Sequence, residues 1–219
     1  MSFPATLAAL TAGIVLSAAL AIRGHYDGSR RILAYVFKPL TVLLLLTLAV
    51  MNFGEAAPRY GWGIALGLVF SLAGDVFLML PRDRFREGLA SFLLAHVCYI
   101  AAFTSGTGFL SAPLPFVIWG VLGLFLLGAL WPGVPKRLRV PVLLYVLVLL
   151  SMAAQAGART LRLKDLSSLL AASGATLFVA SDALLALDRF RAPFRSSRAV
   201  VLSTYFLAQW LIALSVRTP

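Results

Sequence analysis

The chain has 219 residues, of which 61% are hydrophobic and only 12% are charged, and its mean hydropathy is +0.94. Soluble domains are nearer half apolar and a quarter charged, so this composition excludes a soluble protein and predicts one membrane-embedded domain over residues 1–219. The net charge of +11 does not indicate nucleic-acid binding, because the basic residues form short clusters between apolar runs, where membrane proteins carry their topology signals.

Apolar runs near the ~20 residues that a helix needs to cross a bilayer recur eight times. In chain order, we expect spans at Phe3–Ile22, Ile32–Met51, Trp62–Leu80, Gly88–Thr104, Pro113–Leu130, Val140–Ala158, Leu166–Leu187 and Ala199–Val216. The first run lacks the basic leading segment of a cleavable signal peptide, so it is read as the first span. The sequence therefore predicts an all-α bundle of about eight transmembrane helices.

The loops between the runs differ in basic content. Thirteen of the nineteen Lys and Arg follow the first, third, fifth and seventh spans, five lie on the opposite side, and Lys38 lies inside the second span. Cytoplasmic loops carry the excess of positive charge, so we expect the odd-numbered loops in the cytoplasm and both termini outside it. The Ala- and Arg-rich chain with tight loops is typical of a bacterial inner membrane.

Two aspartates lie inside apolar runs, Asp75 in SLAGDVFLML and Asp182 in LFVASDALLAL. A carboxylate in hydrocarbon is costly unless it is paired, neutralised or next to a wet cavity, so an intramembrane acid predicts a functional site. Two carboxylates that share a low-dielectric cavity do not both ionise easily, which suits one acid and one base acting on a bond between them. Separate pairing of each aspartate, for example with Lys38, is the structural alternative.

Other polar residues share the depth of the aspartates. With the expected orientation, all lie roughly 8–12 Å below the cytoplasmic boundary at 1.5 Å per residue. They are Lys38, His96, Tyr145 and Tyr205. We therefore predict one polar cavity in the inner half of the membrane. Tyr99, three residues after His96, and Gln209, four after Tyr205, share faces with these residues and join the candidate lining.

The roles of these supporting residues have alternatives. Lys38, followed by Pro39, is interpreted as a counter-ion for an aspartate, as a contact for a lipid phosphate, or as a side chain that extends to the interface. His96 suits proton relay or a bond to a substrate oxygen, and also an ordinary core role. The tyrosines and Gln209 suit either a polar lining or bracing between helices.

The chain contains no metal-ligand spacing, no nucleophile elbow and no phosphate-binding glycine loop, so we expect neither a metal nor another cofactor. Its single cysteine, Cys98, reads as a small core residue. GDVFLMLPRDRF at 74–85 is similar to SDALLALDRF at 181–190, which indicates two parallel halves of four spans each.

The sequence resembles the YhhN family of membrane proteins, the lysoplasmalogenases. The matching segments occur in family order and cover most of the chain: KPLT (38–41), GDVFLML (74–80), GLASFLLAHVCYIAAF (88–103), LLYVLVLLSM (143–152), LFVASDALLAL (177–187) and STYFLAQWLI (203–212). The resemblance implies an eight-span hydrolase that cleaves the vinyl ether of lysoplasmalogens. The products would be a fatty aldehyde and glycerophosphoethanolamine or glycerophosphocholine. Asp75 and Asp182 match the family's paired acids, and Lys38 and His96 match its other polar positions.

Two other function classes fit the same residues. A proton- or cation-coupled transporter would use the aspartates for its coupling ion. A non-catalytic lipid-binding protein would bind lysophospholipid without turnover. In all three cases the expected partners are a lysophospholipid or an ion and the surrounding bilayer lipids, not nucleic acid.

Overall fold

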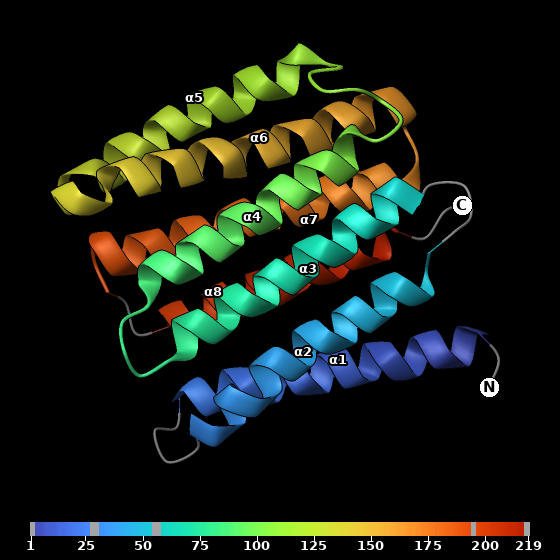
Figure 1. The fold of residues 1–219 in the computed structure, drawn as a ribbon, viewed down its shortest axis with the longest axis horizontal. Helices are drawn as coiled ribbons and strands as arrows, with labels where there is room; N and C mark the ends of the chain where they lie inside the picture. Colours follow the sequence, from blue (N-terminus) through green and yellow to red (C-terminus); the bar gives the residue numbers. More distant parts are fainter. Residues whose placement is uncertain (1–2, 27–30, 54–57, 194–195, 217–219) are drawn as a thin grey trace.

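The computed structural model of the chain describes residues 3–26, 31–53, 58–193 and 196–216. Within these ranges the protein is helical and contains no β-strand (Figure 1). The α-helices are α1 (Phe3–Tyr26), α2 (Arg31–Met51), α3 (Pro58–Met79), α4 (Phe85–Thr104), α5 (Pro113–Leu130), α6 (Arg139–Leu163), α7 (Leu166–Phe190) and α8 (Ser197–Leu214). The short 3-10 helices η2 (Trp131–Gly133) and η3 (Lys136–Leu138) join α5 to α6. All eight α-helices are long and apolar enough to cross a bilayer, which confirms the predicted fold class and an integral membrane protein.

Six of these helices form a closed ring in the order α2, α3, α4, α6, α7 and α8, each packed against the next. Helix α1 packs outside the ring against α2 and α8, and α5 packs outside it against α6 and α7. The ring consists of the six helices that carry the candidate polar residues, whereas α1 and α5 carry none of them. Association of mostly apolar helices in lipid depends on close packing and on polar contacts between helices, and the ring provides both. The four-plus-four internal repeat stays a prediction.

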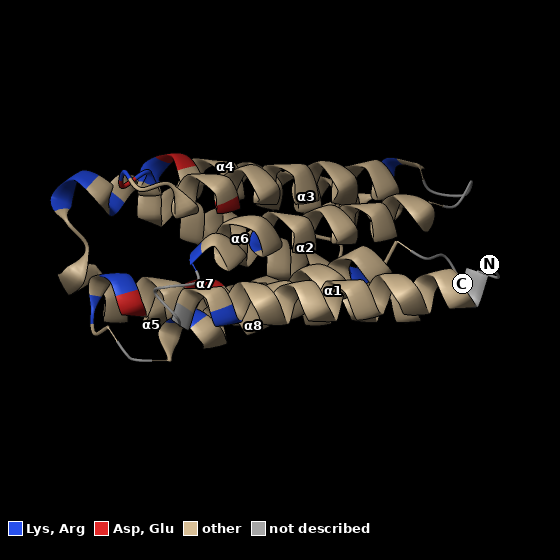
Figure 2. Ribbon diagram, turned by 90° about the horizontal axis from the view of Figure 1, so that it is seen from below, with Lys and Arg blue, Asp and Glu red and all other residues tan. Residues whose placement is uncertain are grey.

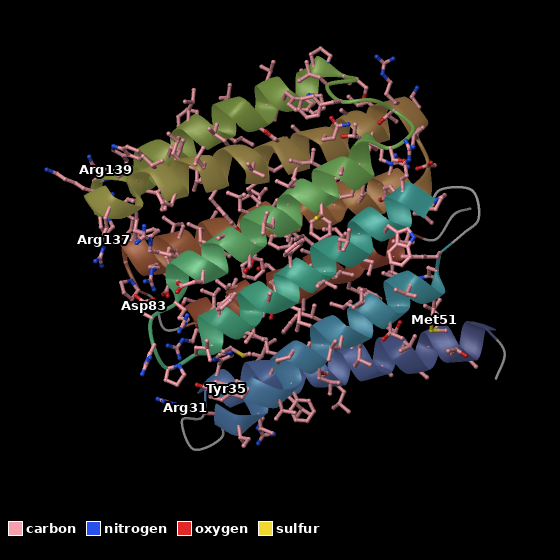
Figure 3. All side chains as sticks on the ribbon, in the orientation of Figure 1. Arg31, Tyr35, Met51, Asp83, Arg137 and Arg139 are labelled. Atoms are coloured by element: carbon pink, nitrogen blue, oxygen red, sulfur yellow. The ribbon has the colours of Figure 1, made fainter. Side chains whose placement is uncertain are left out.

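Basic side chains gather at one end of the bundle, where α3 ends and α4 begins (Figure 2). We call it the basic end. Its described members are Arg23, Arg31, Arg82, Arg84, Arg86, Lys136, Arg137, Arg139, Arg189, Arg191 and Arg198. Arg30, Arg195 and Arg217, which also enter the charge count, lie outside the described residues. Figure 3 shows Arg31, Asp83 and Arg137 toward this end and Met51 toward the opposite one.

Two arginines near the opposite end hold the connection between α4 and α5. Arg159 donates to the carbonyl of Ser105 at 2.5 Å, and its guanidinium lies 4.6 Å from the ring centre of Tyr60. Arg162 donates to the carbonyl of Ser111 at 2.7 Å. Gln155 completes this clamp with bonds to residues 108 and 110. Some of the positive residues at the end opposite the basic end therefore have a structural role.

The turn between α6 and α7 is set by two adjacent residues. Lys164 takes a left-handed conformation with φ of 56° and ends α6. Asp165 then caps α7 by accepting the Ser168 amide N–H at 2.7 Å. Burial by itself raises the pKa of Asp165, but the hydrogen bonds from Ser168 and the positive charge of Arg159 outweigh it and hold that pKa below its usual value. The cap therefore stays ionised at neutral pH.

Gly174 marks the closest approach of α7 to α8. A Cβ atom added there would lie 2.8 Å from the Ala208 carbonyl oxygen and 2.7 Å from Ile212 Cγ1. Gly174→Ala is therefore expected to lower the free energy of unfolding by about 1–3 kcal/mol, because neighbouring backbone must move. Gly120→Ala is the matched control, since that position on α5 has open space around it and alanine favours helix by about 0.5–1 kcal/mol. Thermal unfolding of the two purified variants in detergent measures the difference, and equal stability would contradict the close packing.

Candidate functional site

Asp75 on α3 is held between α2 and α8. Its Oδ1 lies 2.9 Å from Lys38 Nζ, and its Oδ2 accepts the Tyr205 hydroxyl at 2.8 Å. The side chains of Lys38 and Asp75 are 8% and 2% exposed, so this is a buried ion pair. A buried carboxylate is tolerable when its charge is paired and its lone pairs are bonded, and both conditions hold here. The contact favours the counter-ion interpretation of Lys38.

Asp182 on α7 has a different set of partners. Its Oδ2 accepts the Tyr145 hydroxyl of α6 at 2.5 Å and lies 3.5 Å from His96 Nε2 of α4. Both contacts use Oδ2, and no hydrogen bond to Oδ1 is found among the described residues. The Asp182 side chain is 14% exposed, against 2% for Asp75. Asp182 is thus the more accessible acid, and no lysine or arginine in the described ranges is paired with it.

The hydrogen bonds determine which nitrogen of His96 carries a proton. Nε2 lies 3.0 Å from the Tyr145 hydroxyl. Because Tyr145 gives its single proton to Asp182, its oxygen must accept from His96 Nε2–H. His96 Nδ1 is buried without a hydrogen-bond partner among the described residues. His96 and Tyr145 therefore form a hydrogen-bonded chain that ends at Asp182.

One aromatic ring fixes the positions of these groups. Phe178 lies one turn before Asp182 on α7 and makes edge contacts with the rings of His96 at 4.8 Å and Tyr205 at 5.5 Å. Phe92 on α4 adds a further edge contact to Tyr205 at 5.9 Å. Edge-to-face packing holds aromatic rings in defined orientations. Phe178 and Phe92 therefore hold the rings of His96 and Tyr205, one beside each aspartate, in defined orientations.

Both aspartates line one cavity of about 170 Å³. We call it the acid cavity. Its wall also includes His25, Lys38, Asp188, Arg198 and Tyr205, together with apolar side chains such as Leu78 and Phe92. A cavity of this size and polarity has room for several water molecules. The two acids thus have separate hydrogen-bond partners and still face a common space.

An apolar pocket of about 50 Å³ adjoins the acid cavity. The two share Leu78, Phe92, Asp182 and Leu185. The rest of the pocket wall comes from α4, α5, α6 and α7 and is apolar except for Tyr145. We call it the apolar pocket. Asp182 therefore lies where a polar space meets an apolar one.

Tyr99 and Gln209 have a different environment from the other predicted residues. The Tyr99 hydroxyl donates to Gln209 Oε1 at 2.7 Å, and both side chains are fully buried. Neither residue lines the acid cavity or the apolar pocket. The pair braces α4 against α8 beside the site. The structure thus brings Lys38, Asp75 and Tyr205 together, and His96, Tyr145 and Asp182 together, but not this pair.

Residues 33–216 match the YhhN family. This stretch contains both aspartates and all of the six ring helices except the first two residues of α2. The chain belongs to the YhhN family.

Three related proteins have sequences similar to this chain. A membrane protein named YhhN from Escherichia coli O157:H7 is 33% identical to this YhhN-family protein over 207 residues, covering 93% of this chain and 96% of the relative. Human lysoplasmalogenase TMEM86A is 36% identical over 162 residues, covering 69% of this chain and 64% of that protein. Bovine lysoplasmalogenase TMEM86A is 35% identical over 157 residues, with the same coverage. No solved structure matches the chain.

Two residues that line the acid cavity of this YhhN-family protein were not among the site residues predicted from the sequence. His25 lies in the last turn of α1 and Arg198 in the first turn of α8, and both line the acid cavity. In the sequence Arg198 is one of the basic loop residues that give the topology signal and that suit a phosphate, and His25 lies just past the end of an apolar run. Nothing in the sequence places these two residues beside the aspartates.

Among the described residues, no group of three or more His, Cys, Asp or Glu is arranged to hold a metal ion. Cys98 on α4 is half-buried and lies on neither cavity wall. The polar side chains that the site brings together include the two aspartates, Lys38, His96, Tyr145 and Tyr205.

Proposed function

We propose that this protein is a membrane lysoplasmalogenase, which hydrolyses the vinyl ether of a lysoplasmalogen to a fatty aldehyde and glycerophosphoethanolamine or glycerophosphocholine. The observation that carries the proposal is that two intramembrane aspartates with unlike partners line one cavity, next to an apolar pocket. The relatives named lysoplasmalogenase supply the substrate class. The arrangement supplies an acid, an anion, and adjacent polar and apolar spaces for a single-chain lipid.

The partners of the two aspartates assign them different roles. Asp75 has an ammonium on one oxygen and a hydroxyl on the other, and both contacts stabilise its negative charge. Asp182 has the Tyr145 hydroxyl and His96 Nε2 as its partners among the described residues, both on Oδ2, and no lysine or arginine there. Two neighbouring acids in one low-dielectric cavity retain a shared proton, and it belongs on the acid without a positive partner. Asp182 is therefore the proton donor, through Oδ1, and Asp75 is the anion.

The reaction proceeds by addition of a proton to carbon. Asp182 transfers its proton to the β-carbon of the vinyl ether, and the electron pair of the double bond forms the new C–H bond. The resulting oxocarbenium ion is stabilised by Asp75 and by the newly ionised Asp182. Water adds to the cationic carbon and gives its proton to Asp182, which restores the acid. The hemiacetal then collapses to the aldehyde and the free alcohol, so one water is consumed per bond cleaved.

The apolar pocket is the proposed binding site for the hydrocarbon chain of the lipid. The β-carbon is the second atom of the fatty chain, next to the carbon that is bonded to the ether oxygen, so the donor must stand where the chain meets the polar part of the lipid. Asp182 has this position, since it is common to the acid cavity and the apolar pocket. A lipid with one chain would enter from the bilayer between the helices, with its chain against Leu126, Leu130 and Val146.

The charge distribution supports an orientation in the membrane. The basic end is proposed to face the cytoplasm of a bacterial inner membrane, because positive residues are retained there. The chain then starts and ends on the outer side, and the acid cavity lies in the cytoplasmic half.

Release of fatty aldehyde tests the proposal. Purified protein in detergent is incubated with lysoplasmenylethanolamine, and aldehyde is followed through a coupled dehydrogenase. A hydrolase yields aldehyde in proportion to protein. A proton- or cation-coupled transporter with the same aspartates yields no new product and moves its ion only in sealed vesicles, so absence of aldehyde together with vesicle transport would replace this proposal by that one.

A further inference from the structure

The acid cavity continues into a second cavity at the basic end. This space of about 290 Å³ is lined by Gly24, His25, Arg31, Ala34, Tyr35, Leu78, Met79 and Arg198. Three of its residues, His25, Leu78 and Arg198, also line the acid cavity. The two spaces therefore adjoin each other, and the second lies toward the basic end, where α2 and α8 begin.

The walls of this second cavity are positively charged. Arg31 is the first residue of α2 and Arg198 the second residue of α8, so the guanidinium groups come from two helices on either side of α1, which contributes His25. Neither Arg31 nor Arg198 forms a salt bridge within the described part of the chain. Lys38, which lines the acid cavity, is paired with Asp75. Of the acidic groups, Asp188 lines the acid cavity but not the second cavity.

An anion with several oxygens fits this environment. Guanidinium groups present parallel N–H donors that match phosphate geometry. The first turns of α2 and α8 add the positive ends of two helix dipoles to the same space. Positive charges that line one space, with no acidic partner found among the described residues, are stabilised by a ligand that brings negative charge.

We propose that this second cavity binds the phosphate of the lysophospholipid head group, with Arg31 and Arg198 as its ligands. The inference rests on the proposed function and deepens it. The phosphate at the basic end and the fatty chain in the apolar pocket place the glycerol in the acid cavity between them, with the ether carbon atoms beside Asp182. The phosphate site thus fixes the position of the vinyl ether relative to Asp182. It also selects phospholipids over neutral ether lipids.

The test measures the binding of lipids that the protein cannot cleave. The probes are a saturated alkyl-ether lysophosphoethanolamine, which has no vinyl ether to cleave, and the matching alkylglycerol, which lacks the phosphate. Affinity is measured from ligand-dependent thermal stabilisation of purified protein in detergent. We expect Arg31→Gln and Arg198→Gln each to weaken binding of the phosphate-bearing lipid by about 10-fold, the size of a lost charged hydrogen bond at a partly exposed site. Binding of the alkylglycerol should not change.

Arg137→Gln is the matched control, because Arg137 belongs to the basic end but lines neither cavity, and it should leave both affinities unchanged. Equal weakening of both lipids, or no change for either, would overturn the site. Equal protection by inorganic phosphate and by the lysolipid would also overturn it, since it would show a site for free anions. Loss of vinyl ether cleavage with phosphate-dependent binding intact would count only against the proposed hydrolysis.

Discussion

Asp182→Asn is expected to reduce the rate of aldehyde release by about 10³-fold, within the range that a positioned general acid contributes. Asparagine keeps an oxygen that accepts the Tyr145 hydroxyl but has no acidic proton to give. Since no lysine or arginine loses a partner, the helix bundle should keep its stability. The measurement is kcat for lysoplasmenylethanolamine, with thermal unfolding of the same preparation.

Asp83→Asn is the control for this substitution. Asp83 lies at the basic end, is 71% exposed, pairs with Arg189, and lines neither the acid cavity nor the apolar pocket. Its loss should leave kcat unchanged. Substantial turnover by Asp182→Asn would show that the proton comes from another group.

Removal of Lys38 has a different expected result. Lys38→Met should destabilise the protein by about 3–5 kcal/mol, because it leaves the buried carboxylate of Asp75 without its counter-ion. Asp75→Asn should also be destabilising, since it leaves the ammonium unpaired in the same place. Both variants should lose hydrolysis, whereas Asp182→Asn loses hydrolysis with little loss of stability. Thermal unfolding in detergent measures the losses.

The double variant Lys38→Met/Asp75→Leu separates stability from activity. Replacing a whole buried ion pair by apolar side chains is often neutral or stabilising, so the double variant should recover most of the stability that each single variant loses. The two losses are therefore non-additive, with a coupling of about 3 kcal/mol. The double variant should remain inactive, because it lacks the Asp75 carboxylate that stabilises the oxocarbenium ion. Additive losses of stability would mean that Lys38 and Asp75 do not depend on each other.

The sequence was sufficient to predict the eight helices, because hydrocarbon requires about 20 apolar residues per span and leaves a strong pattern. It also placed Asp75, Asp182 and four of their neighbours at one depth, since rise per residue converts sequence position into depth. Depth does not determine which residues touch. Lys38 was equally suited to either acid, and the order of helices around the ring decides that it meets Asp75.

The rotation of each helix about its own axis also limited the prediction of which residues line the cavity. Tyr99 and Gln209 have the spacing of lining residues, but they face each other across α4 and α8. Arg198 and His25 were hidden for a different reason, because basic residues at helix ends are expected in any membrane protein and carry no sign of a cavity beside them. Packing of six helices around one space is a property of the tertiary fold, and no local pattern records it.

The unlike environments of the two acids are the basis of the proposed chemistry. A symmetric pair would leave the location of the shared proton undefined. Here Lys38 fixes the charge of Asp75, and the chain from His96 through Tyr145 orients Asp182 while Oδ1 stays available. The same arrangement keeps each carboxylate bonded in the membrane interior when no lipid is bound.

The isotopic content of the aldehyde formed in D₂O shows whether the proton is delivered to the β-carbon of the vinyl ether. The enzyme is allowed to turn over in deuterated buffer, the aldehyde is trapped by reduction as it forms, and mass spectrometry counts its carbon-bound deuterium. Proton transfer from a solvent-exchanged Asp182 to the β-carbon predicts one deuterium on the carbon next to the carbonyl. Aldehyde without carbon-bound deuterium would contradict the account.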